Sequence, residues 1–144
     1  MENRELSKAE WLSKAEAYCA RSEHCAADVR RKLYEWGAPA DLFDKIEESL
    51  RRNDFLNDAR FCAAYVHDKV VFQSWGRIKI QAGLAALGLP ETEIHRAIDD
   101  LDEPAYRANL RALAKARRAD PPEKRLRFLL QRGFTYSEIE HLCS

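Results

Sequence analysis

Residues 75–94 read WGRIKIQAGLAALGLPETEI, a stretch that combines good helix formers with three glycines and one proline. Leu84 stands four residues before Gly88, and Pro90 stands two residues after it. Glycine readily ends a helix because it adopts the left-handed conformation without a steric penalty. Proline is favoured where the next helix begins. The stretch therefore predicts a helix that ends at Gly88, a sharp corner, and a second helix that begins at Pro90.

The same corner pattern occurs three times along the chain, at intervals of 51 and 45 residues. Each corner glycine has a leucine four residues before it, a residue that starts helices two residues after it, and a large apolar residue six residues after it. At the third corner, Thr135 and Glu138 have the spacing of a capping box. The recurring positions are Gly37, Gly88 and Gly133; Leu33, Leu84 and Leu129; Pro39, Pro90 and Thr135; and Phe43, Ile94 and Ile139.

A longer helix is predicted before each pair, over residues 7–21, 57–73 and 104–118. The apolar residues of each recur at helical spacing and should face a core. The expected core faces are Leu12, Ala15, Tyr18 and Cys19 in the first, Phe61, Ala64, Tyr65, Val66 and Val70 in the second, and Tyr106, Leu110, Leu113 and Ala114 in the third.

These patterns predict an all-α fold of nine main helices. The helices form three tandem three-helix repeats in an elongated arrangement, because a unit of this size buries little apolar surface alone and gains stability from its neighbours. Charged joints are expected near residues 52–54 and 98–104. The predicted repeats span residues 1–54, 55–103 and 104–144.

The composition is that of a globular protein, with 46% hydrophobic and 33% charged residues among 144. The opening stretch MENRELSKAEW is charged and lacks the apolar segment of a signal peptide. The longest nearly apolar run, residues 61–66, is too short to span a bilayer. We therefore expect a cytoplasmic protein with no membrane segment.

Metal-binding and catalytic patterns are weak. The four cysteines form no C-x-x-C pair, and we expect them to be reduced thiols. A zinc site built from Cys19, His24 and Cys25 would have poor ligand spacing. The acidic run at residues 99–103 lacks the loop spacing of a calcium site. No nucleophile motif or phosphate-binding loop is present, so we expect no cofactor and no enzymatic activity.

Charge is unevenly distributed, although 24 cations balance 24 anions over the whole chain. Residues 104–144 carry a net charge of +5, whereas residues 1–103 carry −5. Four cations of the basic segment are spaced by four, four and three residues, which would place them on one helix face. Such a face either neutralises phosphates or simply keeps a surface solvated. The four are Arg107, Arg111, Lys115 and Arg118.

One motif in each predicted repeat, all in order, carries a family resemblance. The motifs are ARSEHCAADVRRKLYEWG at residues 20–37, LNDARFCAAYVHDKV and SWGRIKIQAGLAALGL at 56–70 and 74–89, and RALAKARRADPPEKRLRFLLQRGFTYSEI at 111–139. Together they resemble the RecX family of regulatory proteins of bacterial recombination. The chain departs from the family at Cys25, where members usually have a serine N-cap, and at Gly83, where members often have glutamate.

The resemblance implies binding to the RecA recombinase along the groove of its nucleoprotein filament, with restraint of strand exchange and ATP hydrolysis. It implies no enzymatic activity and no cofactor. The expected partners are the RecA filament and single- or double-stranded DNA within it, and we expect the chain to be a monomer. The residues expected to contact RecA or DNA are Lys69, Arg77, Lys79, Arg111, Lys115, Arg117, Arg118, Lys124, Arg125 and Arg127.

Two other functions remain open at this point. A helix-turn-helix DNA-binding protein acting without RecA would use the corners to present recognition helices. The helices that follow the corners, however, are acidic or neutral and would repel phosphate. A helical scaffold would use the cations only as a solvated surface. Trp75 is interpreted either as a core residue that packs one helix on the next, or as an exposed interface anchor.

Overall fold

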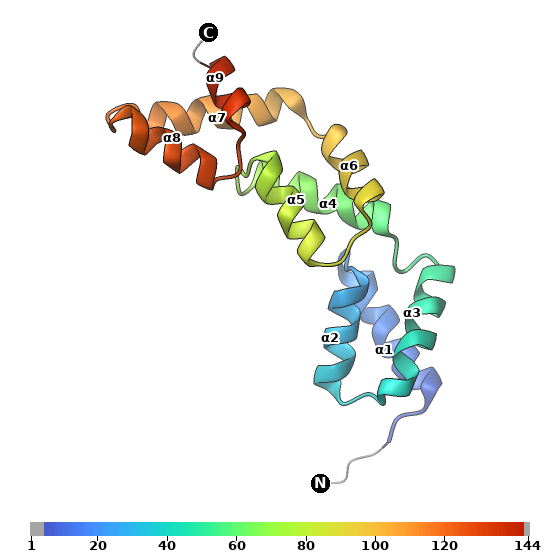
Figure 1. Cartoon of the computed structure of the whole chain (residues 1–144). Coiled ribbons are helices and arrows are strands. Elements are labelled where there is room, and N and C mark those ends of the chain that lie inside the picture. Colours follow the sequence, from blue (N-terminus) through green and yellow to red (C-terminus); the bar gives the residue numbers. More distant parts are fainter. Residues whose placement is uncertain (1–4, 143–144) are drawn as a thin grey trace. The chain divides into compact units, whose positions relative to one another are not determined.

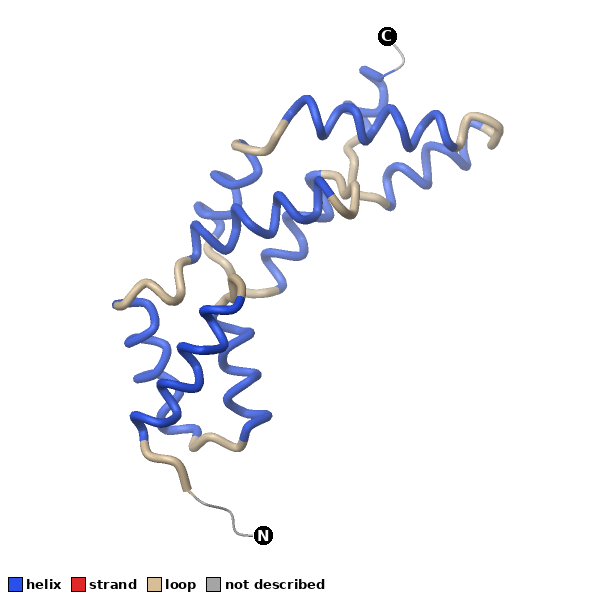
Figure 2. The backbone as a smooth tube through the Cα atoms, turned by 180° about the vertical axis from the view of Figure 1, so that it is seen from behind, coloured by secondary structure: helices blue, strands red, loops and turns tan. Residues whose placement is uncertain are grey.

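The computed structural model describes residues 5–142, which form nine α-helices and one short 3₁₀ helix, with no strand in that range (Figure 1). Short loops join the helices (Figure 2). The predicted all-α fold with repeated three-helix units is confirmed. The helices are α1 (Lys8–Arg21), α2 (Ala26–Trp36), η1 (Ala40–Leu42), α3 (Phe43–Arg52), α4 (Asp58–Val71), α5 (Arg77–Ala86), α6 (Glu91–Asp99), α7 (Glu103–Ala116), α8 (Pro122–Gln131) and α9 (Tyr136–Leu142).

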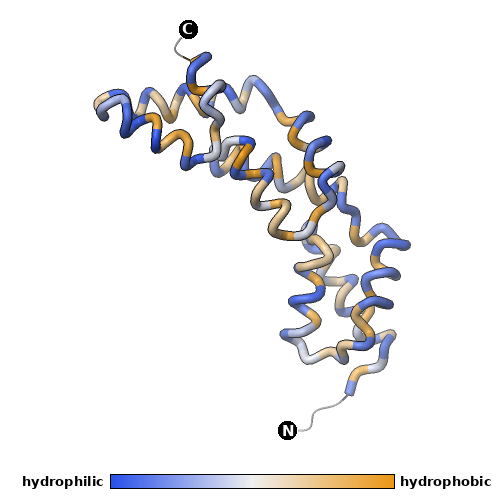
Figure 3. Tube along the Cα trace, in the orientation of Figure 1, coloured by the Kyte–Doolittle hydropathy of each residue, from blue (hydrophilic) through white to orange (hydrophobic). Residues whose placement is uncertain are grey.

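The chain divides into two compact units, the first ending at Phe61 and the second beginning at Cys62. Hydrophobic and hydrophilic residues are interspersed along helices such as α3 and α8 (Figure 3). This pattern gives each helix one side that can be buried and one that can be solvated. The division into repeats 1–54, 55–103 and 104–144 stays a prediction.

The core of the first unit differs in one respect from the predicted face of α1. Ala15 and Cys19 are buried as expected, but Trp11 is the third buried residue of that helix. Leu12 and Tyr18 are only half-buried. An apolar stripe that includes Trp11 and one that includes Leu12 have similar helical spacing. Periodicity alone therefore did not show which of these two residues faces the core. The core consists of Trp11, Ala15, Cys19, Val29, Leu33, Ile46, Leu50 and Leu56.

The three corners share one geometry. Gly37, Gly88 and Gly133 have φ of 84°, 84° and 101°, and the leucine four residues before each is buried. The residue after each glycine donates its backbone N–H to that leucine's carbonyl, at 2.9, 3.2 and 3.2 Å. Each glycine N–H donates to the next carbonyl along, at 3.1, 3.0 and 3.0 Å. This pair of bonds is the Schellman motif, so the predicted corners are confirmed.

The helices after the corners begin slightly differently from the prediction. Pro39 and Pro90 are N-cap residues with ψ of 133° and 139°, one position before the first helical residue. At Thr135 the capping box is confirmed, with bonds of 2.8 and 3.0 Å to and from Glu138. Of the apolar residues six positions after the glycines, Ile94 is buried, whereas the other two are only half-buried.

Helices α4 and α7 bury most of their predicted faces. Phe61, Val66 and Val70 are buried in α4, together with Cys62, which the pattern did not single out, while Ala64 is exposed. In α7, Tyr106 and Leu110 are buried and Leu113 and Ala114 are half-buried. Helix α7 ends at Ala116, so Arg118 lies beyond the helix that was predicted to carry it.

Within the second unit, the loop before α5 contacts the corner at Gly133 through backbone atoms of both. The N–H of Gly76 donates to the carbonyl of Arg132 at 2.8 Å, and the N–H of Ile78 donates to the carbonyl of Gly133 at 2.9 Å. A Cβ atom on Gly76 would lie 2.2 Å from the carbonyl carbon of Gly133. The side-chain amide of Asn109 donates to the carbonyl of Val70 at 2.7 Å. The loop before α5 is therefore packed directly on the corner between α8 and α9.

Replacing Gly88 by valine tests the backbone geometry of a corner alone. No atom beyond the neighbouring residues lies within 4 Å of the position that a Cβ would occupy, so the added Cβ itself meets no steric obstacle. The left-handed backbone nevertheless disfavours a β-branched residue. We expect the free energy of unfolding to fall by at least ~1 kcal/mol. Urea denaturation followed by helical circular dichroism measures this, and an unchanged transition would contradict the corner assignment.

None of the helices between residues 5 and 142 is long and apolar enough to cross a membrane. Cys19, Cys25 and Cys62 are buried, and Cys143 lies outside the described residues. The same range contains no group of three or more His, Cys, Asp or Glu residues positioned to hold a metal ion.

Candidate interaction surface of the second unit

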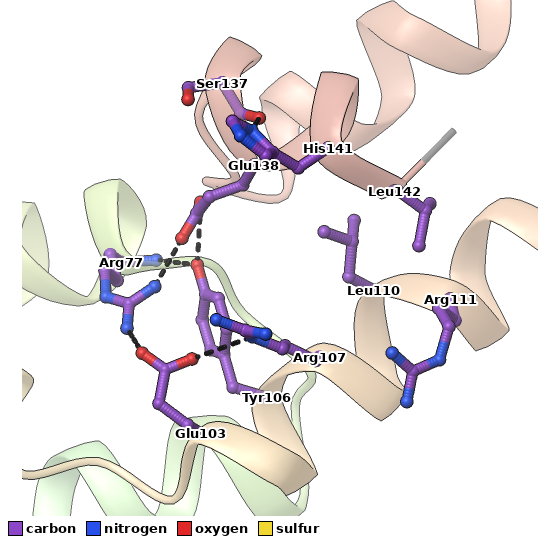
Figure 4. Close-up of a pocket in the computed structure, with 10 residues that line it drawn as sticks. All are labelled: Arg77, Glu103, Tyr106, Arg107, Leu110, Arg111, Ser137, Glu138, His141 and Leu142. Atoms are coloured by element: carbon purple, nitrogen blue, oxygen red, sulfur yellow. Dashed lines mark hydrogen bonds and ion pairs between the residues drawn. The ribbon is translucent and has the colours of Figure 1, made fainter. Parts of the chain in front are cut away.

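Arg77, at the start of α5, is the centre of an ion-pair network. Its guanidinium donates to the carboxylates of Glu103, at the start of α7, and Glu138, on α9 (Figure 4). The guanidinium also lies over the ring of Tyr106, 4.5 Å from its centroid. Arg77 was predicted to contact a partner. That contact stays a prediction; in the structure the Arg77 side chain has three internal neighbours from two other helices.

Tyr106 links the same elements through its hydroxyl group. Its Oη accepts the backbone N–H of Arg77 at 2.9 Å and donates to the Glu138 carboxylate at 3.0 Å. Glu138 thus has two roles, since it also caps α9 through the N–H of Thr135. The ring of Tyr106 packs against Phe134, with 5.3 Å between centroids. These contacts hold the start of α5 against α7 and α9.

A groove of about 590 Å³ lies beside this network, between α7 and α9 (Figure 4). Leu110 and Leu142 supply apolar surface, while Arg107 and Arg111 lie along the α7 side. Arg107 pairs with Glu103 at 3.4 Å. Arg111 has no carboxylate partner among the described residues. The groove is therefore bordered by two guanidinium groups that pair with carboxylates, those of Arg77 and Arg107, and by the guanidinium of Arg111, which does not.

The cations predicted on α7 and α8 divide into two groups. Arg117 pairs with Asp120 at 3.5 Å and lies over the Phe128 ring at 3.9 Å. Arg125 donates to the carbonyls of Arg118 and Asp120, both at 3.4 Å, so it stabilises the turn between the two helices. The other group is exposed, and within residues 5–142 its members have no ion pair with a carboxylate: Arg111, Lys115, Arg118, Lys124 and Arg127.

The side chains of Lys69 and Lys79 both contact the ring of Trp75. Their ammonium groups are 4.8 and 4.5 Å from the ring centroid. The Trp75 ring makes an edge contact with Tyr65 of α4, with 6.5 Å between centroids. Trp75 is half-buried. It therefore contacts α4, as the core interpretation proposed, while the residue stays partly exposed.

Sequence reasoning missed the two contacts that join these elements. The first is made by Gly76, whose small size allows the approach to Gly133. Glu138 was assigned to a capping box, and no signal in the sequence connected it to Tyr106 or Arg77. Gly76 stands where α5 begins, and a glycine, which has no Cβ, allows another backbone to approach closely there.

The described residues thus define an all-α protein of three-helix units with an exposed cationic surface on α7 and α8. A family model for "RecX, second three-helix domain" matches residues 57–98. A regulatory protein RecX of Pelodictyon phaeoclathratiforme is 32% identical over 122 residues, covering 81% of this chain and 76% of that protein. The chain belongs to the RecX family.

Two further comparisons agree with this assignment. A regulatory protein RecX of Geobacillus kaustophilus is 32% identical over 132 residues, which are 85% of this chain but 48% of the relative. This chain therefore spans about half of that relative's length. The crystal structure of RecX from Lactobacillus salivarius is similar in fold, with a TM-score of 0.79, 19% identity and 94% coverage of both chains. The curated relatives are named regulatory proteins.

Tyr106 should make stability depend on alkaline pH. Burial, with the nearby Glu138 carboxylate adding to it, raises the pKa of Tyr106 above its ordinary value. The folded protein then holds the phenol proton more tightly than the unfolded chain does. Stability from this group is complete below pH ~10, the pKa in the unfolded chain, and is lost as pH rises toward the folded pKa.

We therefore expect the free energy of unfolding to fall more steeply above pH ~10 in the wild type than in Tyr106→Phe, by up to about 1.4 kcal/mol per pH unit. Urea unfolding at pH 8, 10 and 11 provides the comparison. Other buried tyrosines and thiols are present in both proteins, so their contributions to the pH dependence of the free energy of unfolding cancel in the comparison. Parallel pH profiles would show that Tyr106 ionises as readily in the folded protein as in the unfolded one.

Proposed function

We propose that this chain is a negative regulator of the RecA recombinase. It binds the RecA nucleoprotein filament and restrains strand exchange and ATP hydrolysis through contact, without catalysis and without a cofactor. The observation that carries the proposal is the group of exposed cations on α7 and α8 without carboxylate partners, in a chain of the RecX family. We further propose a cytoplasmic monomer built from repeats 1–54, 55–103 and 104–144.

The charge arrangement supports a filament as the target. A nucleoprotein filament presents a regular array of phosphates and acidic side chains, and exposed cations on one surface can contact several of them. Cations that already pair with internal carboxylates lose most of this capacity. The exposed residues Arg111, Lys115, Arg118, Lys124 and Arg127 are therefore the proposed contacts. Arg77, Arg117 and Arg125 contribute by holding the surface in place.

The alternative is a helix-turn-helix protein that binds DNA without RecA. Its recognition helices would be α3, α6 and α9. Helix α3 carries as many carboxylates as cations, and α6 carries exposed carboxylates, with the Glu91 side chain 81% exposed. Such charges repel phosphates in a DNA groove. The structure therefore favours filament binding over this alternative.

Cosedimentation distinguishes the two functions. The intact chain is mixed with single-stranded DNA, RecA and a nucleotide that maintains the filament, and in parallel with duplex DNA alone. We expect at least tenfold tighter binding to the filament than to duplex DNA, and inhibition of RecA ATPase. Equal binding to duplex DNA with and without RecA would favour the alternative. Absence of both filament binding and ATPase inhibition would refute the proposal.

A further inference from the structure

Four side chains at the corner between α4 and α5 combine two aromatic residues with a lysine on either side of them in sequence. They are Lys69, Phe72, Trp75 and Lys79, which we call the aromatic–lysine corner. Lys69 and Lys79 place their ammonium groups 4.8 and 4.5 Å from the Trp75 ring centroid. Lys69 also lies 5.1 Å from the ring centroid of Tyr65, one turn earlier on α4. Two cations thus lie beside one indole.

Phe72 extends the same surface and has no role in the core. It is 72% exposed, among the most exposed large apolar residues of the described chain. Its backbone N–H donates to the carbonyl of Asp68 at 2.9 Å, so the helical hydrogen bonding of α4 continues to this residue. Residues three apart on a helix are neighbours on its surface. Phe72 is therefore a neighbour of Lys69.

The corner is held in one shape by bonds from other elements. The guanidinium of Arg132 donates to the carbonyls of Gln73 and Ser74. The N–H of Trp75 donates to the carbonyl of Lys69 at 3.0 Å. Ser74 has a φ of 52°, a left-handed conformation that a serine adopts only where its surroundings require it. A fixed loop thus presents the two aromatic rings.

The charge at the corner favours an anionic ligand. Asp68 is the carboxylate that pairs with Lys69, at 3.4 Å, and its side chain is 51% exposed. Lys79 has no carboxylate partner among residues 5–142. A ligand that uses the whole corner needs negative charge for the ammonium groups and flat apolar surface for the rings. Each nucleotide of a single strand supplies both, a phosphate and an unpaired base.

We propose that the aromatic–lysine corner is a binding site for single-stranded DNA. An unpaired base stacks on Phe72 or the accessible part of Trp75, while Lys69 and Lys79 contact the adjacent phosphates. A paired base cannot stack in this way, so the site discriminates against duplex DNA. This inference deepens the proposed function, since it assigns the DNA contact within the filament to this corner. The site can nevertheless be tested without RecA.

The experiment measures binding of the intact chain to a fluorescein-labelled oligothymidylate by anisotropy at low salt. Phe72→Ala and the double variant Lys69→Gln with Lys79→Gln should each weaken binding at least about fivefold, given what one stacked base or two phosphate contacts contribute. Phe72 is exposed, whereas Lys69 and Lys79 are half-buried, so helical circular dichroism is used to check that each variant folds as the wild type does. An oligonucleotide of abasic sites with the same phosphates should bind Phe72→Ala and the wild type equally.

Matched controls come from the first unit. Tyr34 is an exposed aromatic residue, 78% exposed, so Tyr34→Ala matches Phe72→Ala. Lys8 and Lys45 are exposed, so Lys8→Gln with Lys45→Gln matches the lysine pair in net charge. Both controls should bind the oligonucleotide as the wild type does.

Three results would overturn the proposal. The wild type could fail to bind the oligonucleotide, or the corner variants could bind it as well as their controls. Alternatively, the corner variants could keep oligonucleotide binding and lose filament binding, which would make the corner a surface for protein contact. If the corner variants bind the oligonucleotide more weakly than the wild type does, but the wild type fails to bind RecA filaments, the result supports the binding site and refutes the proposed function.

Discussion

Gly76→Ala should lower the free energy of unfolding of the second unit by at least ~2 kcal/mol. The added Cβ would lie 2.2 Å from the carbonyl carbon of Gly133 and 2.3 Å from both the Gly133 oxygen and the Phe134 nitrogen. All three atoms belong to the backbone, so no flexible side chain can move aside. The two corners would have to separate, which would break the hydrogen bonds from Gly76 and Ile78.

Gly88→Ala is the matched control, because the residue change is the same and the site is open. Gly76 has a φ of −85°, which alanine adopts freely, whereas Gly88 has a φ of +84° and open space around it. The control should therefore cost about 1–2 kcal/mol from backbone conformation alone. Urea denaturation of both variants separates contact from conformation. A cost for Gly76→Ala below that of the control would mean that the corners are not in close contact.

Charge reversal on the basic surface should reduce filament binding by about two orders of magnitude. The variant carries Arg111→Glu, Lys115→Glu and Arg118→Glu, three exposed positions without carboxylate partners among the described residues. Each substitution replaces an attraction to filament anions by a repulsion. Binding also becomes less dependent on salt, because fewer counterions are released when the complex forms. Cosedimentation at several salt concentrations measures both effects.

Lys8→Glu, Lys45→Glu and Arg52→Glu together form the control, since they change net charge equally on exposed positions of the first unit. This variant should retain most of the binding. Neutral substitutions of exposed acidic residues on α6, such as Glu91→Gln and Asp99→Asn, should have little effect. If they weaken binding as much as the reversal on α7, the contact surface has the opposite sign and the assignment to α7 and α8 is wrong.

The sequence by itself determined the features that depend on neighbours along the chain. The Schellman bonds at Gly37, Gly88 and Gly133 join residues three and five positions apart in sequence, and the leucine that each corner buries lies four residues before the glycine. Such interactions need no distant partner, so their residue types and spacing are sufficient to predict them. The exposed cations on α7 and α8 were predictable for the same reason, because a helix leaves its polar side in water.

Only the tertiary structure decided which cations are available. Arg77 reaches Glu103 and Glu138, 26 and 61 residues away in sequence, and therefore belongs to an internal network. Trp11 replaced Leu12 in the core because the neighbouring helices determine which side of α1 is covered. The approach of Gly76 to Gly133 depends on the packing of two corners. Periodicity shows that a helix has a side to bury, but the partner that covers it is determined by long-range packing.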